Sequence, residues 1–265
     1  MTVYGGQGDP RRSIALLWRA PRTGETRPGP KPGLSVDAIV EAAVSVADEQ
    51  GMAALSMRSV GERLGRTGMA LYTYVPGKDE LLDLMYDHVL GELPGGYDLG
   101  GGWRPAAESW ADDLLGCCLR HPWVLQVSQA RPILGPHDFR ALEALAAILR
   151  STGLPARTLR GAVAALYDLV RGAARTIADS RQAPRDTGTS DEEWWQARAA
   201  AMAEVAPDFA AGHPALTWLQ GQDAEPFQDR ALDGFRGSLA LLLDGVEAAR
   251  LRTSAQDGPG PAAAG

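Results

Sequence analysis

The sequence predicts an all-α protein with two helical domains. Apolar residues recur every three or four positions along most of the chain, and no segment shows the strict alternation that is typical of a strand. Between two such regions lies PGGYDLGGG at 94–102, in which five of nine residues are glycine, as expected of a linker. A length of 265 residues also suits two domains better than one.

Residues 1–33 are rich in Gly, Pro and Arg, and we expect them to form a mostly disordered basic arm. From Arg11 to Lys31 there are six basic residues and one acidic residue. This arm can be a solvated tail, or it can neutralise DNA phosphates beside the following domain. Arg27 and Lys31 lie nearest to the first helix of that domain.

Residues 34–93 predict a small helical domain. Ser35 is a good N-cap for a helix with one apolar face, which Gly51 ends. A second helix covers about Met57–Leu64, and a third, capped by Thr67, runs to about Tyr74. Two short helices joined by a tight turn at Gly65 indicate a helix-turn-helix, whose second helix enters the major groove of DNA. A fourth helix is expected from Lys78 to Leu93.

The order of residues in this region resembles the N-terminal domain of the TetR family of one-component bacterial repressors. The resemblance lies in LSMR, LG and ALYTYVPGKDELLDLM, preceded by AIVEAAVSVADEQG, and spans about Leu34 to Leu93. His121-Pro122-Trp123 and the helical remainder are similar to the tetracycline-repressor type of C-terminal half. This resemblance implies a homodimer that binds a palindromic operator and releases it when a small effector binds.

The predicted DNA interface is a basic patch on an otherwise acidic chain. Met57 to Lys78 carries four basic residues and one acidic residue, whereas the whole chain has a formal charge of -7. The recognition segment lacks Asn, Gln and Arg, so phosphate contacts should dominate the affinity. Tyr72 can alternatively pack under the short helix. The residues expected to contact DNA are Arg58, Thr67, Gly68, Met69, Ala70, Tyr72, Thr73, Tyr74 and Lys78.

Residues 103–252 predict a larger helical domain, followed by a disordered tail at 253–265. Helices are expected at about 106–119, 122–129, 136–151, 156–180, 190–206 and 226–252, with a loop at 181–189. Two of these helices carry apolar residues in steps of four and three, typical of helix bundles. Such seams can be intramolecular core, but we favour a twofold dimer in which both helices pair with their copies. The seam residues are Leu159, Val163, Leu166, Val170, Ala173 and Ile177, and Leu232, Phe235, Leu239, Leu242, Val246 and Ala249.

The larger domain is also where a small apolar effector should bind, because helical bundles place ligands in apolar pockets with a few polar groups. Taken alone, each candidate fits a core or surface position better than a ligand contact. The four histidines are scattered without the spacing of metal ligands, and we expect neither a metal nor a cofactor. The candidates are Trp110, His121, Trp123, Tyr167, Arg171, Trp195 and Met202, with Trp194 and Trp218 as further aromatic residues.

Other classes of protein fit less well. No Gly-x-Ser-x-Gly or phosphate-binding Gly-x-x-x-x-Gly-Lys motif is present, which argues against an enzyme. Cys117 and Cys118 are adjacent and cannot form an ordinary disulfide with each other, and no apolar stretch is long enough to span a membrane. We therefore expect a cytoplasmic protein. The alternative function is a helical DNA-binding or partner-binding protein without a small-molecule ligand.

Overall fold

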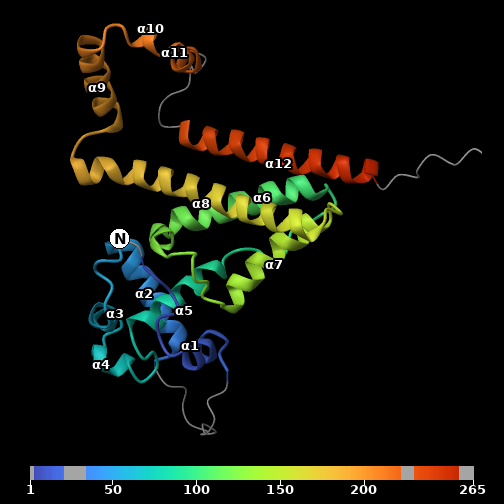
Figure 1. The fold of residues 1–265 in the computed structure, drawn as a ribbon. Helices are drawn as coiled ribbons and strands as arrows, with labels where there is room; N and C mark the ends of the chain where they lie inside the picture. The colour runs from blue at the N-terminus through green and yellow to red at the C-terminus, as the bar shows by residue number, and fades with distance from the viewer. Residues whose placement is uncertain (1–2, 21–33, 222–229, 257–265) are drawn as a thin grey trace, which may run out of the picture.

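The computed structural model describes residues 3–20, 34–221 and 230–256. Within these residues the fold is all-α, as predicted, and the one non-helical pairing is an isolated parallel bridge between Val3 and Val127. The N-terminal helices gather below the larger domain, where long helices lie side by side (Figure 1). None of the helices in the described ranges is long and apolar enough to cross a membrane.

The described residues of the N-terminal half form five helices, and the helix-turn-helix lies where the sequence predicts it. Ser35 and Ser56 cap their helices through the side-chain oxygen, and Gly65 adopts a φ of 63° at the turn. Val60, Leu71 and Val75 are buried between these helices and the core, and Leu64 is partly buried. The helices are α1 Pro10–Leu17, α2 Val36–Gln50, α3 Met57–Arg63, α4 Gly68–Leu71 and α5 Lys78–Leu90.

The first of these helices corrects the prediction of a disordered arm. Residues 10–17 form α1, capped by Asp9, and α1 packs against α5. Leu17 is buried in the core, and Arg19 pairs with Asp37 at the start of α2. Glycine- and arginine-rich composition favours disorder in isolation, but here long-range contacts fix the segment. Arg27 and Lys31 lie outside the described residues.

Two glycines allow α3, the turn and α4 to pack closely. A Cβ atom on Gly61 would lie 2.8 Å from the carbonyl oxygen of Arg66 and 2.9 Å from the backbone nitrogen of Gly68. A Cβ atom on Gly68 would lie 3.1 Å from the carbonyl oxygen of Met57. Gly68 was expected to let DNA approach the backbone, whereas its close neighbour is α3. The backbone of α3 therefore requires glycine at both positions.

We expect Gly61→Ala to lower the free energy of unfolding by about 1 to 2 kcal/mol, because the clash with backbone atoms outweighs the gain of up to ~1 kcal/mol in helix propensity. Urea unfolding followed by circular dichroism measures this. Gly96→Ala is the control, because a Cβ atom there would meet nothing within 4 Å. Equal stability of the two variants would contradict the packing argument.

The larger domain is built on α6, α8 and α12. Figure 1 shows these helices lying side by side with α7 below them, and η1 contacts α2 of the N-terminal half. Cys117 and Cys118 on α6 are free and buried, and burial raises their pKa values to about 12 and about 11. The elements are α6 Trp103–Arg120, 3₁₀ helix η1 Pro122–Gln126, α7 Pro136–Arg150, α8 Ala156–Thr187, α9 Asp191–Val205, α10 Phe209–Gly212, α11 Pro214–Gly221 and α12 Arg230–Gln256.

Two predictions about this domain are corrected. The expected loop at 181–189 is mostly helix, because α8 continues through Pro184 to Thr187 and ends at Gly188 in the left-handed conformation. Likewise α12 continues to Gln256, into the tail expected to be disordered. The other predicted helices are present in the described residues, with ends shifted by a few residues, and residues 226–229 of the last one lie outside that description.

The predicted seams pack inside one subunit. Leu166 and Val170 on α8, and Phe235 and Leu239 on α12, are buried in the core of the subunit, in which α8 and α12 pack against each other. The other seam residues are buried or partly buried against the same core. The seams therefore follow the intramolecular alternative, since their residues are covered within one subunit. A dimer would have to use different faces of α8 and α12.

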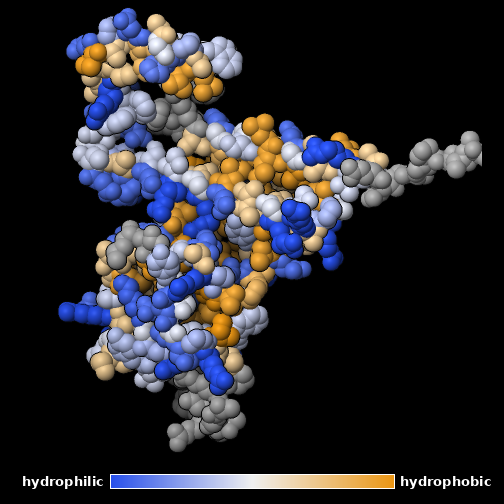
Figure 2. Space-filling view, viewed as in Figure 1, coloured by the Kyte–Doolittle hydropathy of each residue, from blue (hydrophilic) through white to orange (hydrophobic). Residues whose placement is uncertain are grey.

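The segment α9 to α11 stands away from the rest of the molecule (Figure 1). No residue of α9 or α10 is buried. The exposed apolar residues of this segment include Trp194, Trp195, Met202, Val205, Leu216, Trp218 and Leu219. Figure 2 shows apolar surface over this segment and over the middle of α12.

Candidate DNA interface and effector site

The recognition segment presents its polar and small residues outward. Thr67, Met69, Tyr72 and Thr73 are exposed, and Met69 reaches an exposed fraction of 76%. Ala70 is half-buried, and Leu71 anchors the helix in the core. Helix α4 has only four residues, so the segment continues into a turn at Tyr72. Thr67 occupies the N-cap position, but its side chain makes no capping hydrogen bond, contrary to expectation.

The two tyrosines differ in burial. Tyr72 is 44% exposed, which leaves its hydroxyl accessible to a phosphate. Tyr74 is half-buried and packs against the core. The alternative of core packing, which was considered for Tyr72, therefore applies to Tyr74.

The basic side chains of the patch differ in whether they form an ion pair within the described residues. Arg58 pairs with Glu62 across one turn, and Arg63 pairs with Glu49 of α2. Arg66 and Lys78 form no ion pair with any residue in the part of the chain that the structure describes. Lys78 begins α5, whose first-turn N–H groups have no side-chain cap at Gly77. A phosphate bound there would meet both the lysine and the positive end of the helix.

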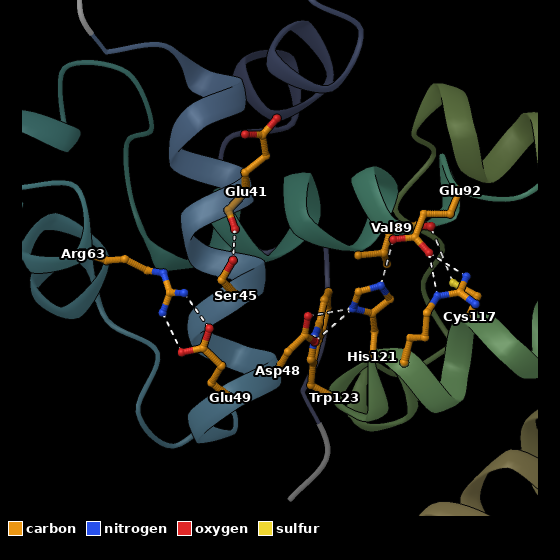
Figure 3. A network of polar contacts seen from close by, with 11 residues as sticks. Glu41, Ser45, Asp48, Glu49, Arg63, Val89, Glu92, Cys117, His121 and Trp123 are labelled. Atoms are coloured by element: carbon orange, nitrogen blue, oxygen red, sulfur yellow. Dashed lines mark hydrogen bonds and ion pairs between the residues drawn. The ribbon is translucent and has the colours of Figure 1, made fainter.

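A polar cluster joins the N-terminal helices to the larger domain, and we call it the interdomain latch. It consists of Asp48 on α2, Glu92 after α5, and His121 and Trp123 around the start of η1 (Figure 3). His121 places Nδ1 2.9 Å from Asp48 and Nε2 2.9 Å from Glu92. The indole of Trp123 donates to Asp48 at 2.8 Å. His121 and Trp123, predicted to bind ligand, instead hold the two halves together.

The latch favours the charged form of His121. Burial alone lowers the pKa of this histidine. The hydrogen bonds to Asp48 and Glu92 together outweigh that effect, so the pKa of His121 is raised above its ordinary value. Both ring nitrogens face carboxylates, and only the doubly protonated imidazolium donates from both. Arg120 also donates to Glu92, at 2.6 Å.

The charge of His121 predicts a pH dependence of stability. Since its folded pKa is raised, its contribution is fully present below the unfolded pKa of ~6.5 and is lost as the pH rises through the folded pKa. We therefore expect the urea midpoint of the wild type to fall, relative to that of His121→Gln, as the pH rises from ~6.5 through the raised pKa of the folded state. A parallel pH profile in the two proteins would contradict a charged His121. Glu92 titrates in a lower range and does not affect this comparison, because its pKa is lowered.

A second cluster lies between α5, α6 and α8, and we call it the aromatic cluster: Tyr86, Trp110, Tyr167 and Arg171. Trp110 and Tyr167 meet edge to face with ring centroids 4.9 Å apart. The indole Nε1 of Trp110 is buried without a hydrogen-bond partner among the described residues. Burial raises the pKa of Tyr86 to about 12, and the neighbouring Arg171 opposes that rise. Burial also raises the pKa of Tyr167, so both phenols remain neutral donors.

The remaining candidates lie elsewhere. Trp195 and Met202 line a pocket of about 770 Å³ on α9 and α10, together with Arg198, Val205 and Phe209. This pocket is on the segment that stands away from the body, and Trp194 and Trp218 are also exposed on that segment. Within the described residues, no group of three or more His, Cys, Asp or Glu is arranged to hold a metal ion. The predicted ligand residues thus divide among the aromatic cluster, the latch and α9.

Comparison with known proteins identifies the family. Residues 39–85 match the model of the bacterial regulatory proteins of the tetR family, and residues 97–250 match the tetracyclin repressor-like C-terminal domain. The chain belongs to the TetR family. It is 42% identical over 250 residues to the HTH-type transcriptional repressor DrrR1 of Streptomyces coeruleorubidus, which covers 93% of this chain and 88% of that protein.

More distant TetR relatives agree. An HTH-type transcriptional regulator of Saccharopolyspora erythraea is 32% identical over 212 residues, covering 80% of this chain and 89% of its own. The structure of ActR from Streptomyces coelicolor in complex with actinorhodin has a TM-score of 0.67 and 26% identity, covering 83% of this chain and 97% of ActR. Apo ActR has a TM-score of 0.68 and 25% identity, covering 84% of this chain and 100% of ActR. As a TetR protein, the chain is a DNA-binding transcriptional regulator and not an enzyme.

Sequence reasoning left out several residues of these sites. Arg66 lies in the predicted basic patch from Met57 to Lys78 but is not among the residues expected to contact DNA, although a basic residue in the helix-turn-helix turn is a usable signal. Tyr86 lies within the apolar run of α5 and carries no pattern that separates it from core residues. Asp48 and Glu92 resemble ordinary surface acids in sequence, and only their place opposite His121 gives them a role.

Proposed function

We propose that this TetR protein is a one-component repressor that binds a palindromic operator as a homodimer and is released by a small, mainly apolar effector. The observation that carries the proposal is the exposed recognition segment next to two cations without ion-pair partners in the described residues, Arg66 and Lys78. Repression is supported by the relative that is named a transcriptional repressor. A protein that acts on bacterial chromosomal DNA works in the cytoplasm.

The DNA contacts fall into two groups. Arg66, Tyr72 and Lys78 would bind phosphates, and the N–H groups at the start of α5 would share a phosphate with Lys78. Thr67, Met69, Ala70 and Thr73 would face the base edges, where methyl groups and hydroxyls give modest discrimination. Arg58 can leave Glu62 for a phosphate because both side chains are exposed. Gly68 and Tyr74 would support the segment from behind.

The dimer would form through outward faces of α8 and α12 that the subunit itself leaves uncovered. On α12, Gly234, Ser238, Leu241 and Gly245 are exposed in steps of four, three and four. Leu241 has an exposed fraction of 74%, and a Cβ atom on Gly234 or Gly245 would meet nothing within 4 Å. Exposed Gly161, Ala164 and Gly172 lie similarly on α8. Small residues around a leucine let two helices approach closely, and two recognition helices about 34 Å apart then read a palindrome.

The apolar segment α9 to α11 also supports a dimer. Its tryptophans and leucines are exposed in the described structure, and a second copy would bury them together with the faces of α8 and α12. Trp195 and Met202 would then contribute to contacts between subunits rather than to an isolated pocket.

The effector would bind at the aromatic cluster. Trp110 and Tyr167 supply apolar ring faces, the unpartnered indole N–H calls for a hydrogen-bond acceptor, and both tyrosine hydroxyls can donate. ActR, a structural relative, has been solved in complex with actinorhodin. We infer an aromatic or otherwise apolar molecule that carries at least one hydrogen-bond acceptor.

Fluorescence anisotropy tests the proposal with the purified full chain and labelled DNA from upstream of its own gene, at several salt concentrations. We expect saturable binding by two subunits per site, discrimination against random DNA, and a steep salt dependence. Equal affinity for random DNA would place the operator elsewhere, and no binding at any salt concentration would favour the partner-binding alternative. A screen for compounds that release the operator would then identify the effector.

A further inference from the structure

The N-terminal segment at residues 3–20, which we call the strap, begins on the larger domain. The backbone N–H of Val3 donates to the carbonyl oxygen of Gln126 at 2.9 Å, and the N–H of Ser128 donates to the carbonyl oxygen of Val3 at 2.8 Å. These two bonds form the parallel bridge to Val127. The strap is therefore fixed to the chain that leaves η1.

The strap then crosses to α5 of the DNA-binding domain. The N–H of Gly6 donates to Oδ1 of Asp83 at 2.9 Å, and Asp83 has an exposed fraction of only 1%. Gly5 is buried, and a Cβ atom there would lie 2.7 Å from a side-chain carbon of Ile133. Helix α1 continues along α5. Asp83 lies five residues after Lys78, so the strap contacts α5 in the half of the helix that begins at the proposed phosphate site.

The strap makes a second pair of contacts at its other end. The indole of Trp18 donates to the carbonyl oxygen of Leu134 at 3.0 Å, and its ring lies 6.3 Å from that of Phe139 on α7. The next residue, Arg19, donates to Asp37 at the start of α2. The strap thus contacts both domains at each end, separately from the covalent linker at 94–102.

Arg171 connects the anchor of the strap to the aromatic cluster. Its guanidinium reaches from α8 to the carbonyl oxygens of Val127, at 3.1 Å, and Val124, at 3.4 Å. Arg175 makes a similar contact with the carbonyl oxygen of Leu125, at 3.0 Å. Val127 is also the residue to which Val3 is bridged. Arg171 therefore contacts the same segment that anchors the strap.

We propose that the strap fixes α5 relative to the larger domain, and that Arg171 is a positioning residue that transmits changes at the effector site to the DNA-binding helices through Val127 and Val3. This inference rests on the proposed function, because it assigns the coupling between the operator and effector sites. A strap that holds the recognition helices in place reduces the conformational freedom lost when the dimer binds its operator. Loosening the strap should therefore weaken operator binding without touching DNA.

Two variants of the full chain test the strap. Gly5→Val places a side chain against Ile133 and Asp83, and Val3→Pro/Gly6→Pro removes the two N–H donors that anchor the strap; both preserve the net charge. Tyr4→Ala is the matched control, because Tyr4 has an exposed fraction of 51%. Operator affinity is measured by anisotropy, exchange of the Ser128 amide by mass spectrometry, and helicity by circular dichroism.

We expect both strap variants to bind the operator about tenfold more weakly, with faster exchange at Ser128, unchanged helicity and no effect of Tyr4→Ala. Wild-type operator affinity in both variants would overturn the proposal. So would a Ser128 amide that already exchanges in the wild type as fast as in an unfolded peptide. If the wild type itself does not prefer its operator, the proposed function fails, whereas the exchange measurement still reports whether the strap is docked.

A double-mutant cycle tests the role of Arg171. We expect Arg171→Met to weaken operator binding about fivefold in the absence of any effector, and to add little when combined with Val3→Pro/Gly6→Pro, because Arg171 and Val3 both act through Val127. A purely structural role of Arg171 in the larger domain would give additive losses, and additivity would separate Arg171 from the strap.

Discussion

Replacing both Arg66 and Lys78 by alanine is expected to weaken operator binding about a hundredfold or more, because a dimer would lose four phosphate contacts. The two side chains have no ion-pair partner in the described residues, so their removal leaves no carboxylate unpaired. The slope of log affinity against log salt concentration should become shallower by about 3 to 4. Stability should change little, since both side chains are exposed.

The matched control for that variant is Arg131→Ala/Arg150→Ala, which removes the same charge from exposed positions in the larger domain. We expect it to bind the operator nearly as well as the wild type, because charges beyond a Debye length of ~8 Å are largely screened. An equal loss in both double variants would mean that net charge, rather than contact with phosphates, sets the affinity. Anisotropy titrations over a series of salt concentrations distinguish the two cases.

Sequence reasoning succeeded where local chemistry decides the structure. The cap at Ser35, the turn at Gly65 and the apolar face of α2 are all local signals, and each is present as predicted. These signals succeed because a helix end or a tight turn depends on residues within a few positions of each other. The family was accessible for the same reason, since the helix-turn-helix is a short contiguous pattern.

Predictions failed where contacts between distant residues decide the structure. The composition of residues 1–33 favours disorder, yet Asp83, Ile133 and Leu134 hold the strap in place. No sequence pattern near the N-terminus predicts that these distant residues contact the strap. The seams of α8 and α12 were recognised correctly as apolar stripes, but periodicity alone does not say whether a stripe meets its own chain or a second copy.

The candidate ligand residues show the same limit. Trp110, Tyr167 and Arg171 come together, whereas His121 and Trp123 belong to the latch and Trp195 to a separate surface. In the sequence, an aromatic residue has the same appearance in all three settings. Its identity gives its apolar area and its one polar atom, but it does not show which residue that atom contacts. The hydrogen-bond partner separates the cases: Trp123 has Asp48, whereas Trp110 has none among the described residues.

That difference predicts that replacement by phenylalanine costs the two tryptophans different amounts of stability. Truncating either residue to alanine should lower the free energy of unfolding by about 4 kcal/mol, since both are almost fully buried. Trp123→Phe should still cost about 1 to 2 kcal/mol, because it leaves Asp48 without one of its donors. Trp110→Phe should cost less, because it also removes a buried N–H that has no partner in the described residues.

Urea unfolding of the four variants measures these differences, and an equal loss in the two phenylalanine variants would mean that the Trp110 N–H has a partner in solution. If Trp110→Phe is as stable as predicted, the indole N–H contributes nothing to folding, and a polar atom kept in the core at no benefit to stability is best explained by a ligand. The same variant should then require about tenfold more effector to release the operator, because a hydrogen bond of about 1.4 kcal/mol is lost from the complex alone.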